Sequence, residues 1–96
     1  MMDKRKVYIE KLTAQLKEWD AKIDILKAKY EKAEADAKIE YKKTIDSLQG
    51  KYKEMQTRLH DLETAAEDAW EDVKSGTEKA IAELKTAFNE ALSKFK

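Results

Sequence analysis

The chain of 96 residues contains no cysteine and no proline, and its only glycines are Gly50 and Gly76. Without cysteine it can form no disulfide and has no thiolate chemistry. Without proline, no residue type forces a helix to end. Uncharged apolar runs are far too short to cross a membrane, and no signal peptide is evident. We therefore expect a soluble protein with a cytoplasmic location.

The chain also lacks a net charge, because 20 basic and 20 acidic residues balance. A nucleic-acid-binding protein usually presents a basic face, and none is evident, so we expect no nucleic-acid partner. Charged residues still make up 42% of the chain. Such a composition, rich in Ala, Glu, Lys and Leu, is typical of coiled coils and long helices. An acidic band at 61–72 contains no Lys or Arg and is predicted to be a solvated surface or to dock on a lysine-rich helix.

The sequence does contain an 11-residue repeat. Its aromatic members are Tyr8, Trp19, Tyr30, Tyr41 and Tyr52. A second ladder with the same step is Leu26, Ala37, Leu48, Leu59, Trp70, Ile81 and Leu92. Eleven residues complete about three α-helical turns, so each ladder keeps one direction on a helix, whereas strand side chains alternate with period two. The repeat predicts an all-α protein of long amphipathic helices, arranged as a coiled coil or helical hairpin.

We treat residues 1–96 as a single helical coiled-coil unit. A long helix is expected over about 3–63, with Asp3 as its N-cap, and a shorter helix over about 65–95. Heptads also fit locally, and their shift by four residues at Ala37–Tyr41 is interpreted as a stutter within the long helix.

Two matches to the capping box predict where the helix could break. Thr64 to Glu67 suggests a break at 64–67, and Ser75 to Glu78 suggests one at 75–77, where Gly76 is a natural helix-ending residue. Since neither segment contains proline, one uninterrupted helix stays open as an alternative.

The apolar stripe needs a surface to cover it. About 90 helical residues would span roughly 135 Å, and one such helix cannot bury its own stripe. The helix must therefore oligomerise, fold back or lie on another surface. The residues predicted to form this oligomer or packing seam are Leu12, Trp19, Ile23, Leu26, Tyr30, Tyr41, Ile45, Leu48, Tyr52, Met55, Leu59, Leu62, Trp70, Val73, Ile81, Leu84, Phe88 and Phe95.

Catalytic and metal-binding patterns are weak. His60, the only histidine, would share a helix face with Glu63 and Glu67. Helical bundles build di-iron sites from paired Glu-x-x-His segments, but here the order is reversed and occurs once, so we predict solvated polar side chains. The carboxylates have no predicted cleft that would perturb a pKa, and no glycine-rich phosphate loop occurs. We expect no enzyme activity, cofactor, metal or small-molecule substrate.

Several segments carry a resemblance to known proteins. They are Tyr8-Ile-Glu-Lys-Leu12, Gln15-Leu-Lys-Glu-Trp19-Asp-Ala-Lys-Ile-Asp24, Ala69-Trp-Glu-Asp-Val-Lys-Ser-Gly76-Thr-Glu-Lys-Ala80 and Ser93-Lys-Phe-Lys96. Together they resemble a family of small bacterial coiled-coil proteins that are often labelled stress-response proteins. The resemblance implies an intracellular bacterial protein with a stress role and brings no catalytic or binding residues. The 11-residue period is more loosely similar to exchangeable apolipoproteins and desiccation-protective helices.

Two functional hypotheses follow. The first is a structural or interaction protein that self-associates through the stripe, with a homo-oligomer as the expected state. The alternative is an amphipathic binder of lipid, a partner helix or exposed hydrophobic surfaces, in which Trp70, Phe88 and Phe95 would insert. The acidic band at 61–72 weighs against binding to anionic lipid.

Overall fold

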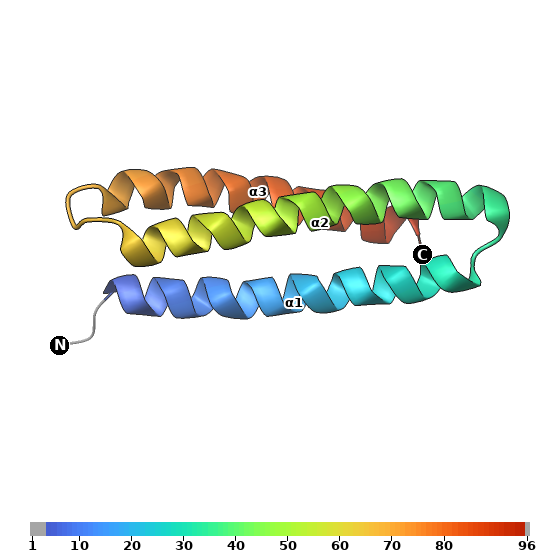
Figure 1. The fold of residues 1–96 in the computed structure, drawn as a ribbon, viewed down its shortest axis with the longest axis horizontal. Helices are drawn as coiled ribbons and strands as arrows, with labels where there is room; N and C mark the ends of the chain where they lie inside the picture. The colour runs from blue at the N-terminus through green and yellow to red at the C-terminus, as the bar shows by residue number, and fades with distance from the viewer. Residues whose placement is uncertain (1–3, 96) are drawn as a thin grey trace.

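The computed structural model describes residues 4–95 and shows three long α-helices in an up-down-up bundle (Figure 1). Helix α1 spans Lys4–Lys32, α2 spans Ala35–Thr64 and α3 spans Trp70–Lys94. The bundle measures 53 × 21 × 19 Å. Helices α1 and α3 run in the same direction, and α2 is antiparallel to both. The predicted all-α fold is confirmed.

The long helix predicted over about 3–63 is wrong, because α1 ends at Lys32 and α2 begins at Ala35. Folding back lets the apolar stripe of α1 meet that of α2, and the burial of large side chains outweighs the few helical hydrogen bonds lost at the turn. The heptad shift at Ala37–Tyr41 lies in the first turns of α2, directly after the chain reverses at Ala33 and Glu34, so it belongs to the start of a second helix and is not a stutter within one long helix. Asp3 lies outside the described residues.

The chain reverses again between Thr64 and Trp70. This break overlaps the segment 64–67, but the capping box there is not formed. The Thr64 hydroxyl donates to the carbonyl of His60 at 3.0 Å, within α2, and Ala69 is the N-cap of α3. The shorter helix consequently begins at Trp70 and not near residue 65.

The other candidate break, at 75–77, lies inside α3, which is continuous. Gly76 is a helical residue there, with no positive φ. A Cβ on Gly76 would lie 3.3 Å from Nη1 of Arg58, so the residue allows a side chain of α2 to cross α3 closely.

Within residues 4–95, no helix has the length and apolar character required to cross a membrane.

Candidate interaction seam

The core of the bundle is built from side chains that repeat every seven residues along each helix. The buried positions of α1 are Leu12, Leu16, Trp19, Ile23 and Leu26. Those of α2 are Ile45, Leu48, Met55 and Leu62, and those of α3 are Trp70, Thr77, Leu84, Phe88 and Ala91. Steps of three and four residues put such positions on one helix face, which is the pattern of coiled-coil and bundle packing.

The structure brings the predicted seam residues together in this core. Those that are buried are Leu12, Trp19, Ile23, Leu26, Ile45, Leu48, Met55, Leu62, Trp70, Leu84 and Phe88. Those that are partly buried and packed against them are Tyr30, Tyr41, Tyr52, Leu59, Val73, Ile81 and Phe95. The seam joins three helices of one chain, so a single copy covers its own stripe.

Three buried residues lie outside the predicted set: Leu16, Thr77 and Ala91. The signal that would have found the last two is the strict seven-residue spacing Trp70, Thr77, Leu84, Ala91. Thr77 is fully buried, and its hydroxyl donates to the carbonyl of Val73 at 2.8 Å. This hydrogen bond within α3 satisfies the polar group and so makes its burial tolerable.

Aromatic rings connect α1 to α3, whereas α2 makes the close backbone approaches to both neighbours. The rings of Trp19 and Phe88 are stacked, with centroids 5.8 Å apart and planes 4° from parallel. Nearer the amino end of α1, Tyr8 meets Trp70 edge to face at 5.8 Å. Large rings fill the wider α1–α3 space that aliphatic side chains would leave open.

Arg5 of α1 caps the carboxyl end of α2. Its Nη2 donates to the carbonyls of Leu62 at 2.7 Å, Glu63 at 3.1 Å and Ala65 at 2.7 Å. The last turn of α2 contains no basic residue, so the cation that favours a helix carboxyl end comes from another helix. The guanidinium carbon also lies 5.9 Å from the Trp70 ring, which links all three helices at this end.

At the opposite end, Lys29 of α1 donates to the carbonyl of Phe95 at 3.0 Å and so caps α3. The Phe95 ring stacks on Tyr41 with centroids 4.0 Å apart. Beside it, Lys94 and Glu40 form an ion pair at 2.7 Å. The hydrogen bond from Lys94 lowers the pKa of Glu40 below its usual value.

In the described part of the chain, three buried side-chain atoms have no hydrogen-bond partner, and one of them is Nε of Arg58. The Tyr8 hydroxyl and the Trp70 indole nitrogen are buried and have no hydrogen-bond partner. Burial raises the pKa of Tyr8, and the negative charge of Glu78 raises it further. The Lys74 ammonium lies over both rings, 5.1 Å from that of Tyr8 and 5.5 Å from that of Trp70.

The ionisable side chains of the described residues are spread over the surface and do not cluster at one site. In the described part of the chain, no group of three His or acidic residues could hold a metal ion. His60 and Glu63 are exposed, and Glu67 lies beyond the end of α2, so the spacing considered for a metal site is not formed on one helix. A surface groove of 410 Å³ between α2 and α3 is bordered by lysine and glutamate side chains, among them Lys43, Lys51 and Glu90, and by uncharged residues such as Leu48 and Ala87.

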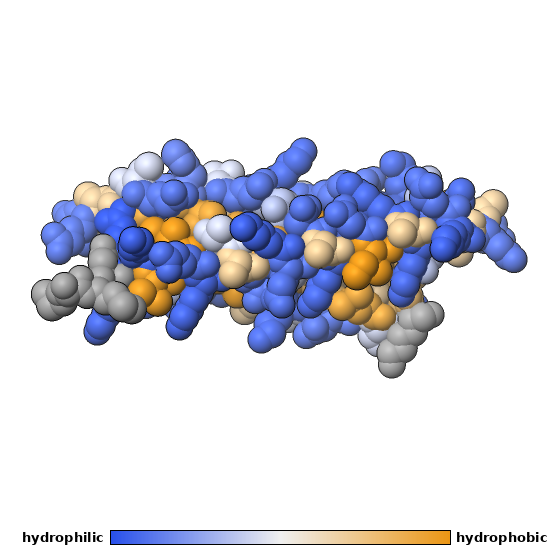
Figure 2. Space-filling model, turned by 90° about the horizontal axis from the view of Figure 1, so that it is seen from below, coloured by the Kyte–Doolittle hydropathy of each residue, from blue (hydrophilic) through white to orange (hydrophobic). Residues whose placement is uncertain are grey.

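The bundle leaves some apolar surface uncovered. Ile25 on α1 and Ile39 on α2 are exposed by 51% and 58%. Figure 2 shows the face seen from the α1 side, where two apolar patches lie among hydrophilic side chains, one towards each end. This face is a mixture of apolar and charged surface and has no dominant hydrophobic area.

Comparison of the chain with protein-family models, with curated proteins and with solved structures finds no match.

Proposed function

We propose that this protein is a non-enzymatic structural and interaction protein that self-associates through its apolar helical stripe. One observation supports the proposal: the buried side chains of the described residues lie in the contacts between helices. Buried side chains recur at heptad spacing on all three helices, while the carboxylates and lysines are spread over exposed faces. Repeats of this kind can pair helices within one chain or between chains.

Self-association is tested by light scattering coupled to size-exclusion chromatography, from dilute to concentrated protein. We expect the mass to rise with concentration. A wild-type chain that stays monomeric at every concentration would contradict the proposal.

Two neighbouring substitutions show whether the stripe carries the association. Leu26 is 0% exposed, so Leu26→Asp would bury an unpaired charge and should abolish both the fold and the assembly. Ile25→Asp is the matched control, since Ile25 is 51% exposed, and it should change neither. If Ile25→Asp alone prevented association, copies would meet through the outer face of α1 and the stripe would have no part in it.

The second candidate function is the binding of lipid or of exposed hydrophobic surfaces. The uncovered apolar patches of Figure 2 and the ring-filled α1–α3 side favour it, because opening this side would expose Trp19 and Phe88. We expect zwitterionic vesicles to shift tryptophan fluorescence, and anionic vesicles to do so less, because the acidic side chains of 61–72 are exposed. Unchanged fluorescence with both kinds of vesicle would exclude this function.

The resemblance to small bacterial coiled-coil proteins extends the proposal to a role under stress. In that role a stored assembly would open and expose its stripe when the cell is stressed.

A further inference from the structure

The turn between α1 and α2 is made of residues that favour helix. The sequence from Tyr30 to Ala37 contains no glycine and no proline, and alanine occupies three of its positions. Alanine, glutamate and lysine are among the strongest helix formers. Only Ala33 and Glu34 depart from helical structure. The local sequence therefore favours continuing the helix at the place where the chain reverses.

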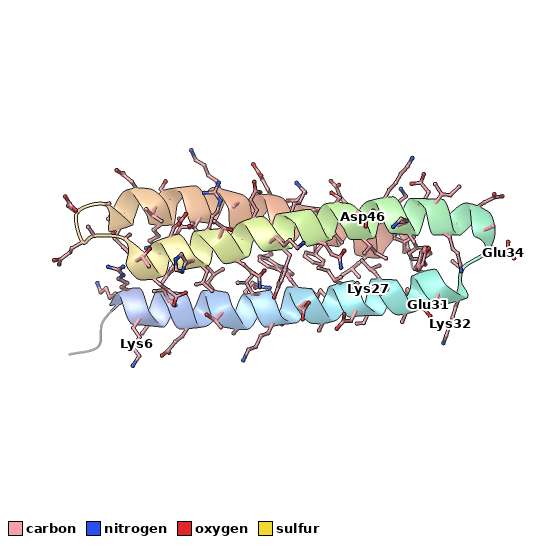
Figure 3. The ribbon with its side chains drawn as sticks, viewed as in Figure 1. Lys6, Lys27, Glu31, Lys32, Glu34 and Asp46 are labelled. Atoms are coloured by element: carbon pink, nitrogen blue, oxygen red, sulfur yellow. The ribbon has the colours of Figure 1, made fainter. Side chains whose placement is uncertain are left out.

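Few interactions involve the turn residues themselves, although the ammonium of Lys38 in α2 lies over the ring of Tyr30 in α1, 5.2 Å from its centroid. Glu34 is the N-cap residue of α2, with φ −71° and ψ 159°, and its side chain makes no capping hydrogen bond. The amide of Ala33 donates to the carbonyl of Tyr30 at 3.2 Å. The side chains of Glu31, Lys32 and Glu34 are exposed and lie at the end of the bundle (Figure 3). The α2–α3 connection differs, because Arg5 donates to the carbonyl of Ala65 within it and to that of Leu62 at the end of α2.

The stripe keeps its phase across the turn. Tyr30 and Tyr41 are eleven residues apart, which is about three turns of a continuous helix. If Ala33 and Glu34 became helical, the core-facing sides of α1 and α2 would lie on the same side of one long helix. A straightened chain would then present a single stripe and could not cover it alone.

We propose that this turn straightens and that two copies of the chain exchange α1, forming a domain-swapped dimer. This inference rests on the proposed self-association and names its partner as a second copy. In the dimer, Lys4–Thr64 forms one helix of about 90 Å at 1.5 Å per residue. Helix α1 packs on α2 and α3 of the partner subunit, where Arg5 makes the same capping hydrogen bonds. Every seam contact is preserved, and the two forms differ mainly at the turn.

Ala35→Pro separates the two forms. Ala35 is the first residue of α2, where proline fits because the N–H of this position has no acceptor within the helix. The extended backbone of Glu34 suits a residue that precedes proline. In the straightened helix, proline at this position would clash with the carbonyl of Glu31. We expect dimerisation to weaken by about 10⁴-fold, which corresponds to about 3 kcal/mol in each of the two chains.

The experiment refolds concentrated wild type and Ala35→Pro from urea and compares their mass by light scattering and their length by small-angle X-ray scattering. Wild type should yield a dimer markedly longer than the 53 Å bundle, and the variant a monomer of that length. Glu34→Ala, which favours helix at the turn, should increase the dimer fraction, and Glu34→Ser, which adds a capping hydroxyl, should decrease it.

The two proposals fail in different ways. If Ala35→Pro retains its fold and dimerises as well as wild type, the exchange is overturned while self-association stands. If Ala35→Pro unfolds, the Glu34 pair decides, and equal dimer fractions in Glu34→Ala and Glu34→Ser overturn the exchange. If wild type never associates, both proposals are overturned.

Discussion

Arg5 donates a hydrogen bond of 2.7 Å to the carbonyl of Ala65, 60 residues further along the chain. A basic residue in the first turn of a helix is ordinarily unfavourable, because that end of the helix is already positive. The antiparallel arrangement reverses this effect, since the amino end of α1 lies beside the carboxyl end of α2. The charge of Arg5 therefore complements α2 although it opposes α1.

We predict that Arg5→Ala lowers the free energy of unfolding by about 1–3 kcal/mol, because it leaves several carbonyls at the end of α2 without their donor. Arg5→Lys should recover part of the loss, since an ammonium keeps the charge but lacks the planar fork. Urea denaturation measures both variants. Lys6→Ala, at an exposed position next to Arg5, should be close to neutral, and an equal loss there would argue against a specific cap.

The stack of Trp19 on Phe88 should make the α1–α3 side sensitive to truncation. Phe88 is 1% exposed, so Phe88→Ala should cost about 3–5 kcal/mol of stability. Phe88→Leu should cost less and still change the near-ultraviolet circular dichroism of Trp19. Asn89→Ala, on the exposed side of the same turn, is the control. A loss of less than about 1 kcal/mol for Phe88→Ala would mean that the ring is not packed as the structure shows.

The two glycines should respond differently to alanine. A Cβ on Gly50 would meet nothing within 4 Å, so Gly50→Ala should stabilise α2 by up to about 1 kcal/mol. A Cβ on Gly76 would lie 3.3 Å from Arg58, which must then shift, so the gain from Gly76→Ala should be smaller or absent. Thermal unfolding of the two variants makes the comparison. A larger gain at Gly76 than at Gly50 would contradict the crossing of Arg58 over α3.

Alkaline pH should destabilise the bundle through Tyr8 and Tyr52. Burial raises the pKa of both phenols in the folded state, above an unfolded value of about 10. The unfolded chain thus loses these protons at lower pH than the folded chain. The free energy of unfolding therefore keeps its full value, as far as these two groups are concerned, below about pH 10 and falls as the pH rises above it. Tyr8→Phe should reduce this loss without a penalty at neutral pH, because the Tyr8 hydroxyl has no hydrogen-bond partner. Stability curves measured against pH for the variant and for Tyr52→Phe test this.

The apolar period predicted which side chains form the core, because burial depends on the face that a residue occupies and a regular helix determines that face. Leu26, Leu48 and Leu84 were identified from spacing alone, and all three are buried. The period could not determine what each face meets. The same stripe is compatible with a long helix that oligomerises and with a folded bundle, since both arrangements bury the same side chains.

The first chain reversal was missed for a physical reason. Ala33 and Glu34 carry none of the local signals that end helices, and the turn there depends on the packing of distant residues such as Trp19 and Phe88. The cap by Arg5 was missed as well, although a cluster of basic residues at the positive end of a helix is a signal that such residues serve another element.

Arg5 and Lys29 both belong to α1, and between them they cap the carboxyl ends of α2 and α3. Helix ends usually fray one by one, and their amides exchange with solvent earlier than those of helix centres. Here the carboxyl ends of α2 and α3 both receive their capping hydrogen bonds from α1. Departure of α1 would release both at once, so the amides of the last turns of α2 and α3 should become exchangeable in one event, at the rate at which α1 separates.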